Sequence, residues 1–251
     1  VGAREVGFLY GHYKRLKNEV TGVLTGKGLD FGGSLVRTEA TGYGTCYFVK
    51  EMLGVLGDSF DGKNVTISGS GNVAIYAMEK TIELGGKVIA MSDSSGYIHN
   101  KNGLKLDLIK DIKETKRQRI SEYANQDKDT TFVSNGSIWD ISCDIALPCA
   151  TQNELEKKHA ELLVRGGLIA VAEGANMPCT PEAVEVFHKN KIPFGPGKAS
   201  NAGGVAVSGL EMSQNSIRGS WTFDEVDKKL QDIMKNIHDG SYEASEKYND
   251  K

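Results

Sequence analysis

The sequence predicts an α/β fold in which a doubly wound parallel sheet is flanked by helices. Short apolar runs, typical of buried strands, alternate with longer stretches of helical periodicity. A G-x-G-x-x-A pattern at Gly69–Ala74 separates one such run from one such stretch. Glycine is enriched, with 30 of 251 residues, against a background of about 7%. Glycine concentrates where the backbone must approach a ligand closely.

The N-terminal part predicts two helices separated by a loop. A glycine-rich stretch, residues 22–33, predicts the loop or linker, and a second helix is expected over residues 38–56. The opening helix is predicted by apolar residues spaced three or four apart, which form one face: Val6, Leu9, Tyr10, Tyr13 and Leu16.

Strands and helices are expected to alternate in the rest of the chain. A β-branched run predicts a strand at Val65–Ser68, and a helical pattern follows at Asn72–Leu84. Lys87–Ser92 is typical of the next strand. The other expected elements are a polar-faced helix at Leu106–Tyr123, buried strands at Cys143–Leu147 and Gly167–Ala172, and a C-terminal helix at Phe223–Tyr248. This alternation predicts parallel strands joined by crossover helices.

Composition excludes several classes of function. Thirty Lys and Arg against 33 Asp and Glu leave a net charge of −3, so no nucleic-acid partner is expected. No apolar run approaches the roughly 18 residues of a spanning helix, so no membrane partner is expected. Scattered histidines without an H-E-x-x-H pattern predict no metal site. Reduced thiols and a cytoplasmic location are predicted by four cysteines that form no C-x-x-C pair: Cys46, Cys143, Cys149 and Cys179.

The strongest local motif is the turn at Gly69–Ala74, because it follows a predicted strand and opens a predicted helix. Gly69 would make the tight turn, and Gly71 would let the backbone approach a pyrophosphate at the helix N-terminus. The alternative is a glycine-rich turn between strand and helix that binds no ligand. We expect the cofactor contacts of this turn to be Gly69, Gly71, Asn72 and Val73.

The end of the second predicted strand discriminates NAD from NADP. Asp93 could accept hydrogen bonds from the ribose hydroxyls of NAD. Its neighbours Ser92 and Ser94 are small donors that suit a phosphate. On the predicted helix that follows, three cations at helical spacing would also suit a 2′-phosphate: Lys113, Lys116 and Arg119. A solvated helix face is the alternative for these cations, so the pattern favours NADP without excluding NAD.

Several segments together resemble one family, the hexameric glutamate dehydrogenases. The resemblance covers essentially the whole chain, and its segments occur in the family's order: Arg37–Gly44, Gly69–Ala74, Ala172–Pro178, Ser200–Val205 and Ser208–Ser216. The Ser92–Gly96 segment and the spacing of the three cations resemble the NADP-dependent microbial members. The resemblance implies a modified Rossmann sheet, mostly parallel with one strand antiparallel, and NADP as cofactor, with NAD as the alternative.

The resemblance also implies roles for individual residues. Arg37 and Thr41 would flank the nicotinamide carboxamide. Val205 would form an apolar wall along the substrate, and Ser208 would donate to a substrate carboxylate. The other implied cofactor contacts are Ala150 and Thr151 along the ribose, and Asn176 and Asn201 at the nicotinamide ribose and carboxamide.

The implied reaction converts L-glutamate to 2-oxoglutarate and ammonia, with a homohexamer as the implied assembly. The catalytic lysine and aspartate of the family lie in an N-terminal substrate domain whose motifs this sequence does not contain, so no catalytic residue is expected here. Residues 1–33 would end that domain and its linker, and residues 34–251 would form the dinucleotide domain. The alternatives are a branched-chain or aromatic amino-acid dehydrogenase, favoured less because Ser208 suits a second carboxylate, and a non-catalytic nucleotide-binding module.

Overall fold

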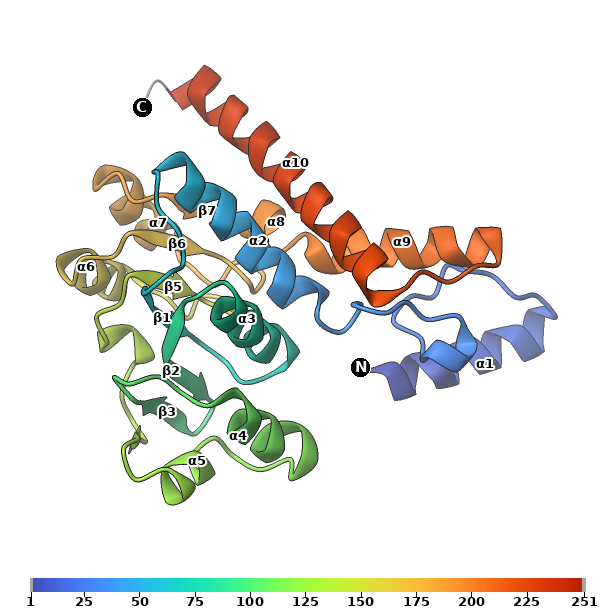
Figure 1. The fold of residues 1–251 in the computed structure, drawn as a ribbon, viewed down its shortest axis with the longest axis horizontal. Coiled ribbons are helices and arrows are strands. Elements are labelled where there is room, and N and C mark those ends of the chain that lie inside the picture. Colours follow the sequence, from blue (N-terminus) through green and yellow to red (C-terminus); the bar gives the residue numbers. More distant parts are fainter. Residues whose placement is uncertain (1, 250–251) are drawn as a thin grey trace.

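The computed structural model describes residues 2–249 and contains a seven-stranded sheet in the order β4-β3-β2-β1-β5-β6-β7 (Figure 1). Strands β1, β2, β5, β6 and β7 are parallel, whereas β3 is antiparallel to both β2 and β4. This confirms the mostly parallel sheet with one reversed strand. The strands are β1 (Asn64–Ile67), β2 (Lys87–Asp93), β3 (Gly96–His99), β4 (Thr131–Val133), β5 (Ile145–Leu147), β6 (Ala170–Ala172) and β7 (Phe194–Gly195).

From β1 the chain first adds β2, β3 and β4 on one side of that strand, and it then adds β5, β6 and β7 on the other side. Helix α3 (Asn72–Glu83) connects β1 to β2, whereas α6 (Lys157–Arg165) connects β5 to β6 and α7 (Pro181–Lys189) connects β6 to β7. The strand order therefore changes direction between β1 and β5. In doubly wound sheets, ligands bind in the crevice outside the carboxyl ends of the strands at such a switch point.

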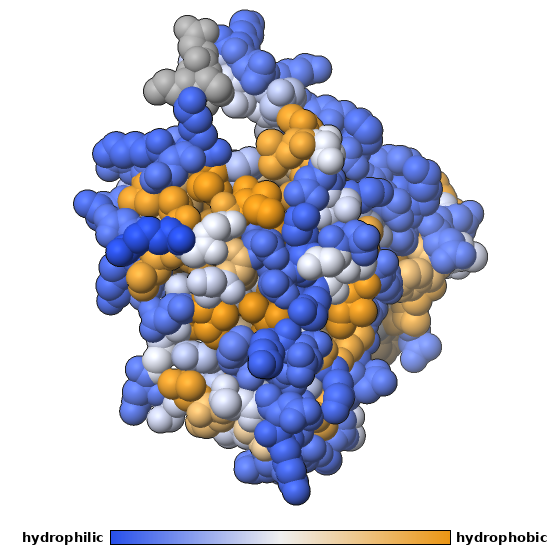
Figure 2. Space-filling model, turned by 60° about the vertical axis from the view of Figure 1, so that its left-hand side comes forward, coloured by the Kyte–Doolittle hydropathy of each residue, from blue (hydrophilic) through white to orange (hydrophobic). Residues whose placement is uncertain are grey.

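Two hydrophobic clusters cover the two faces of the sheet. Successive side chains of a strand point to opposite faces, and β5 shows this directly. Ile145 and Leu147 belong to the cluster under α2 (Ala40–Val55) and α3, whereas Ala146 belongs to the cluster under α6 and α7. On the face shown in Figure 2, hydrophobic areas alternate with hydrophilic ones.

Helix α2 is buried along most of its length because it packs against α3, α9 (Gly203–Ile217) and α10 (Phe223–Asn249). Glycines make this close packing possible. A Cβ at Gly42 would lie 2.5 Å from the Ala77 backbone nitrogen, and one at Gly203 would lie 2.1 Å from the Ala40 carbonyl oxygen. Part of the glycine surplus therefore serves the approach of helices to each other rather than the approach to a ligand.

The prediction of one continuous helix at Leu106–Tyr123 is wrong. Helix α4 (Leu106–Lys110) passes into a π-helical turn, η2 (Asp111–Thr115), and a separate helix, α5, covers Glu122–Gln126. Arg117 has a left-handed backbone with φ of 54°. The break has a tertiary cause, because the Ile120 N–H donates to the Asp93 carboxylate at the end of β2.

The ends of the molecule confirm the predicted helices, although the first is less buried than its pattern indicates. In α1 (Ala3–Lys17), Tyr10 is buried, whereas Leu9 and Leu16 are more than half exposed. The expected loop contains a 3-10 turn, η1 (Leu29–Phe31), and the remaining short elements are η3 (Ile138–Asp140) and α8 (Gly197–Ser200). Among residues 2–249, no helix combines the length and apolar character needed to cross a membrane.

Candidate nucleotide-binding cleft

A cavity of about 590 Å³ lies beyond the carboxyl ends of β1, β5 and β6. Segments far apart in the sequence form it: the chain before α2 and its first turn, the start of α3, the loops after β5 and β6, and α9 (Figure 1). Eight of the residues singled out from the sequence line it: Arg37, Thr41, Val73, Ala150, Asn176, Asn201, Val205 and Ser208.

The turn after β1 has the geometry that the glycine motif predicts. Gly69 has a φ of 88°, and its N–H donates to the Ser92 hydroxyl at 2.9 Å. A Cβ at Gly69 would lie 3.1 Å from the Cys149 carbonyl oxygen, so a side chain there would be crowded as well as strained by the positive φ. A Cβ at Gly71, by contrast, would meet no protein atom within 4 Å. The N-terminus of α3, which starts at Asn72, therefore stays open to an anion.

Asp93 turns its carboxylate inward. Ser95 donates from its N–H and its hydroxyl to Oδ1, and the Ile120 N–H donates to Oδ2 at 2.8 Å. Lys113 Nζ lies 3.4 Å from the same Oδ2. Burial raises the pKa of Asp93, but these hydrogen bonds and the lysine charge outweigh burial and lower it overall. Its acceptor sites are thus taken up by the protein rather than left for ribose hydroxyls.

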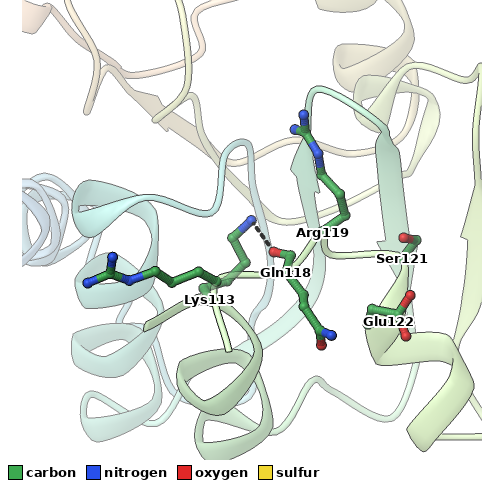
Figure 3. A pocket seen from close by; sticks show the side chains of 6 residues that line it. Lys113, Gln118, Arg119, Ser121 and Glu122 are labelled. Carbon is green, nitrogen blue, oxygen red and sulfur yellow. Dashed lines mark hydrogen bonds between the residues drawn. The ribbon is translucent and has the colours of Figure 1, made fainter. Parts of the chain in front are cut away.

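A second pocket, of about 470 Å³, lies beside the end of β2 and is basic. Figure 3 shows the Lys113 and Arg119 side chains reaching to one side of it, with a hydrogen bond from Lys113 to the Gln118 carbonyl. Arg119 also donates to the Ser94 hydroxyl. Lys116 is outside this lining and pairs with Asp111 at 2.5 Å. The prediction of three cations on one helix face was therefore wrong, because the helix breaks between them.

Two loops of the cleft are joined through asparagines. The Asn201 side chain donates to the Ala175 carbonyl at 3.1 Å and to Asn176 Oδ1 at 2.9 Å. The predicted pair therefore meets in space, although its members lie 25 positions apart in the sequence. Arg37 Nε, near the same cavity, is buried without a hydrogen-bond partner. A buried unsatisfied donor is costly, and a bound acceptor would satisfy it.

The loop after β5 depends on a carboxylate that the sequence did not single out. Glu154 Oε1 accepts hydrogen bonds from the Ser68 hydroxyl, the Ala150 N–H and the Thr151 N–H. Burial raises the pKa of Glu154 despite these bonds. Ala150 and Thr151 accordingly offer a ligand their carbonyl oxygens and side chains, since their N–H groups are occupied.

At the other end of the cleft, Ser208 is buried and its hydroxyl accepts a hydrogen bond from Thr25 at 3.1 Å. Thr25 comes from the glycine-rich loop, where no local pattern marked it. Val205, one turn earlier on α9, is 72% exposed. Val205 and Ser208 therefore both line the cavity, and the Thr25 hydroxyl contacts that of Ser208.

Other chemistries find little support in the part of the chain that the structure describes. No group of three or more His, Cys, Asp or Glu side chains is placed to hold a metal ion there. The four cysteines are free and buried. Cys149 lines the cavity, but burial raises its pKa well above the usual value, so it is a neutral thiol and a poor nucleophile.

Comparison with known proteins gives the family. The model of the "Glutamate/Leucine/Phenylalanine/Valine dehydrogenase" family matches residues 32–251. The chain belongs to this dehydrogenase family. It is 59% identical over 242 residues to a glutamate dehydrogenase of Bacteroides thetaiotaomicron, covering 95% of this chain and 54% of the relative. It is 55% identical over 241 residues to an NADP-specific glutamate dehydrogenase of Haemophilus influenzae, with the same coverage.

Solved structures within the family agree with the fold. The glutamate dehydrogenase of Plasmodium falciparum superposes with a TM-score of 0.97 at 47% identity, covering 100% of this chain and 54% of that one. The chain thus spans about half the length of the curated relatives it matches. Other family relatives carry the names NAD(P)-specific and NAD-specific glutamate dehydrogenase.

Proposed function

We propose that this chain is the NADP-binding part of a glutamate dehydrogenase that interconverts L-glutamate with 2-oxoglutarate and ammonia. One observation carries the proposal. The start of α3 lines the same cavity as Asn176 and Asn201, and the turn before it is hydrogen-bonded to Ser92, two residues from the Ser94 hydroxyl that Arg119 of the basic pocket contacts. A dinucleotide phosphate needs such a series: a nicotinamide site, a pyrophosphate site and a second phosphate site.

The basic pocket supports NADP over NAD. The 2′-phosphate would lie against Lys113, Arg119 and the Ser94 hydroxyl, which give it charge-assisted hydrogen bonds. Ser92 and Asp93 would contribute to this pocket at the end of β2. Asp93 accepts hydrogen bonds from both Lys113 and the Ile120 N–H and so positions the lysine. Lys116 remains a proposed contributor at longer range. NAD is the alternative, and it would require the Asp93 carboxylate to exchange protein donors for ribose hydroxyls.

The other half of the cofactor would extend into the larger cavity. Its pyrophosphate would meet the backbone of Gly69 and Gly71 and the first residues of α3, Asn72 and Val73. The free Arg37 Nε fits an acceptor such as the carboxamide oxygen. When bound, the nicotinamide would exchange a hydride with the substrate. The contacts proposed for the nicotinamide and its ribose are Arg37, Thr41, Ala150, Thr151, Asn176 and Asn201.

The substrate would lie between the cofactor and α9. The buried Ser208 hydroxyl, kept in place by Thr25, would donate to the distal carboxylate of 2-oxoglutarate, and Val205 would contact its carbon chain. The groups that move protons are proposed to lie in the part of a longer polypeptide that the relatives contain. Residues 1–33 would belong to that second domain, since α1 keeps apolar side chains exposed, and residues 34–251 to the dinucleotide domain. The whole protein is proposed to be a cytoplasmic homohexamer.

Binding of NADPH and NADH to this chain tests the cofactor proposal. Calorimetric titration should give tighter binding of NADPH, and failure to bind NADPH would overturn the proposal. The substrate is tested with the full-length protein, which should reduce 2-oxoglutarate in preference to branched or aromatic 2-oxoacids. A preference for those acids would favour a leucine, phenylalanine or valine dehydrogenase. If the full-length protein bound NADPH but converted none of these substrates, a non-catalytic nucleotide-binding module would be favoured.

A further inference from the structure

Glu173 is a buried carboxylate that has no part in the cofactor and substrate contacts proposed for the cleft. It follows β6, and its residue is 6% exposed. Its oxygens accept hydrogen bonds from two backbone groups, the Cys179 N–H at 3.1 Å and the Gly197 N–H at 2.7 Å. Burying a carboxylate is costly unless its oxygens are well satisfied. Here both oxygens are used, one by each of two separate segments.

The two segments that Glu173 holds carry the two asparagines of the cleft. Cys179 ends the loop that contains Asn176, and Gly197 begins the short helix α8, which Asn201 follows. A Cβ at Gly197 would lie 3.1 Å from Glu173 Oε2, so the close approach of this N–H depends on glycine. The Ser200 hydroxyl adds a third tie, since it donates to the Glu173 carbonyl at 2.7 Å.

The Glu173 carboxylate therefore links the two segments that carry Asn176 and Asn201, beside the tie from the Ser200 hydroxyl. Asn201 donates to Asn176 Oδ1 at 2.9 Å only when the loop after β6 and the end of α8 keep their relative position. Glu173 bridges these segments on the side away from the cavity, and the asparagine pair bridges them at the cavity. Charge-assisted hydrogen bonds to a buried carboxylate are stronger than neutral ones, which makes Glu173 the firmer of the two bridges.

We propose that Glu173 is a positioning residue that holds Asn176 and Asn201 in the geometry required by the nicotinamide half of the cofactor. This inference rests on the proposed function. It separates the two ends of the cleft, because the hydrogen bonds of the Glu173 carboxylate go to Cys179 and Gly197 and not to η2 or the basic pocket. Its loss should affect the nicotinamide half and leave the 2′-phosphate half unchanged.

Glu173→Gln is the decisive variant, because it keeps the shape but points an NH₂ group at a backbone N–H. We expect the Kd of NADPH to rise about tenfold, the effect of losing one buried charge-assisted hydrogen bond. The Kd of 2′,5′-ADP, which contains only the phosphorylated adenosine half, should change less than about twofold. Glu182→Gln makes the same chemical change at an exposed position in the first turn of α7 and should leave both values unchanged.

A double-mutant cycle shows whether Glu173 acts through the asparagines. If it does, adding Glu173→Gln to Asn176→Ala should weaken NADPH binding little further. Additive losses, or equal weakening of NADPH and 2′,5′-ADP, would show a general structural role and overturn the inference. Should Glu173→Gln fail to fold, Glu173→Asp keeps the charge, cannot reach both N–H groups, and should show the same ligand selectivity. An unaltered chain that binds neither ligand would overturn the proposed function as well.

Discussion

Lys27 Nζ lies 2.6 Å from Glu211 Oε1, and neither side chain is exposed to solvent. The same ammonium donates to the Leu24 carbonyl, and the Gly26 N–H donates to Glu211 Oε2. The ion pair thus fastens the glycine-rich loop to α9, one turn after Ser208. Lys27, which stands between Gly26 and Gly28, is thus committed to contacts within the protein.

Removing one member of this pair should be strongly destabilising. Lys27→Met leaves the Glu211 charge buried without a partner, so the free energy of unfolding in urea should fall by about 3–5 kcal/mol. Lys27→Met combined with Glu211→Leu should recover much of the loss. Lys228→Met, which breaks an exposed pair with Asp232, should have little effect. If Lys27→Met and Lys228→Met lowered the free energy of unfolding equally, burial would not be the reason for the effect.

The basic pocket predicts different effects for two neighbouring lysines. Lys113→Ala should weaken NADPH binding by about 10- to 100-fold, because a charge-assisted contact to the phosphate is lost. NADH binding should hardly change. Lys116→Ala removes the same charge three residues later but from a side chain paired with Asp111, so its effect should be much smaller. Comparable losses from both variants, measured by calorimetry, would mean that Lys116 turns into the pocket when NADPH binds.

The two cleft carboxylates Asp93 and Glu154 should shift stability with pH in opposite directions. The pKa of Asp93 is lowered, so its contribution is complete above its unfolded pKa, about 3.9, and is lost as pH falls through the folded value. The pKa of Glu154 is raised. Its contribution is complete below about 4.3 and is lost as pH rises through the folded value.

Unfolding temperatures measured from pH 3 to pH 8 separate these effects. Asp93→Asn should flatten the loss of stability in acid. Glu154→Gln should be at least as stable as the unaltered chain at pH 7, because all three donors reach Oε1 and an amide oxygen can accept from them. Marked destabilisation by Glu154→Gln at pH 7 would contradict this account. Glu154→Ala, which leaves the donors unsatisfied, should lower the unfolding free energy by about 1–3 kcal/mol.

Two glycines on α2 should respond to alanine with opposite signs. At Gly42 a Cβ would collide with the backbone of α3, so Gly42→Ala should lower the unfolding temperature clearly. At Gly54 a Cβ would meet nothing within 4 Å. Gly54→Ala should therefore stabilise the protein by about 0.5–1 kcal/mol, since alanine is the better helix former. Calorimetric unfolding of the two variants checks the pair, and equal destabilisation would contradict the role of helix packing.

Local pattern was sufficient to predict the elements around the first strand. The β-branched run at Val65–Ser68, the glycine turn and the helix from Asn72 follow from short-range preferences, and the structure contains each of them. Strands β3, β4 and β7 were missed because they are not continuous runs of buried apolar residues, whereas β5 and β6, which are equally short, are buried at every position. The break after Thr115 was missed because it goes with a contact to a carboxylate distant in sequence, that of Asp93.

The sequence by itself thus determined the alternating α/β order, the glycine turn and the set of residues that resemble a dehydrogenase cleft. Only the tertiary structure decided how those residues are used. It turned Asp93 inward, separated Lys116 from Lys113 and Arg119, and brought Thr25 to Ser208 and Glu173 behind the two asparagines. The physical reason is that strand and turn preferences act between near neighbours. The partner of a buried charge or hydroxyl is instead chosen by whichever segment folding brings within hydrogen-bond distance.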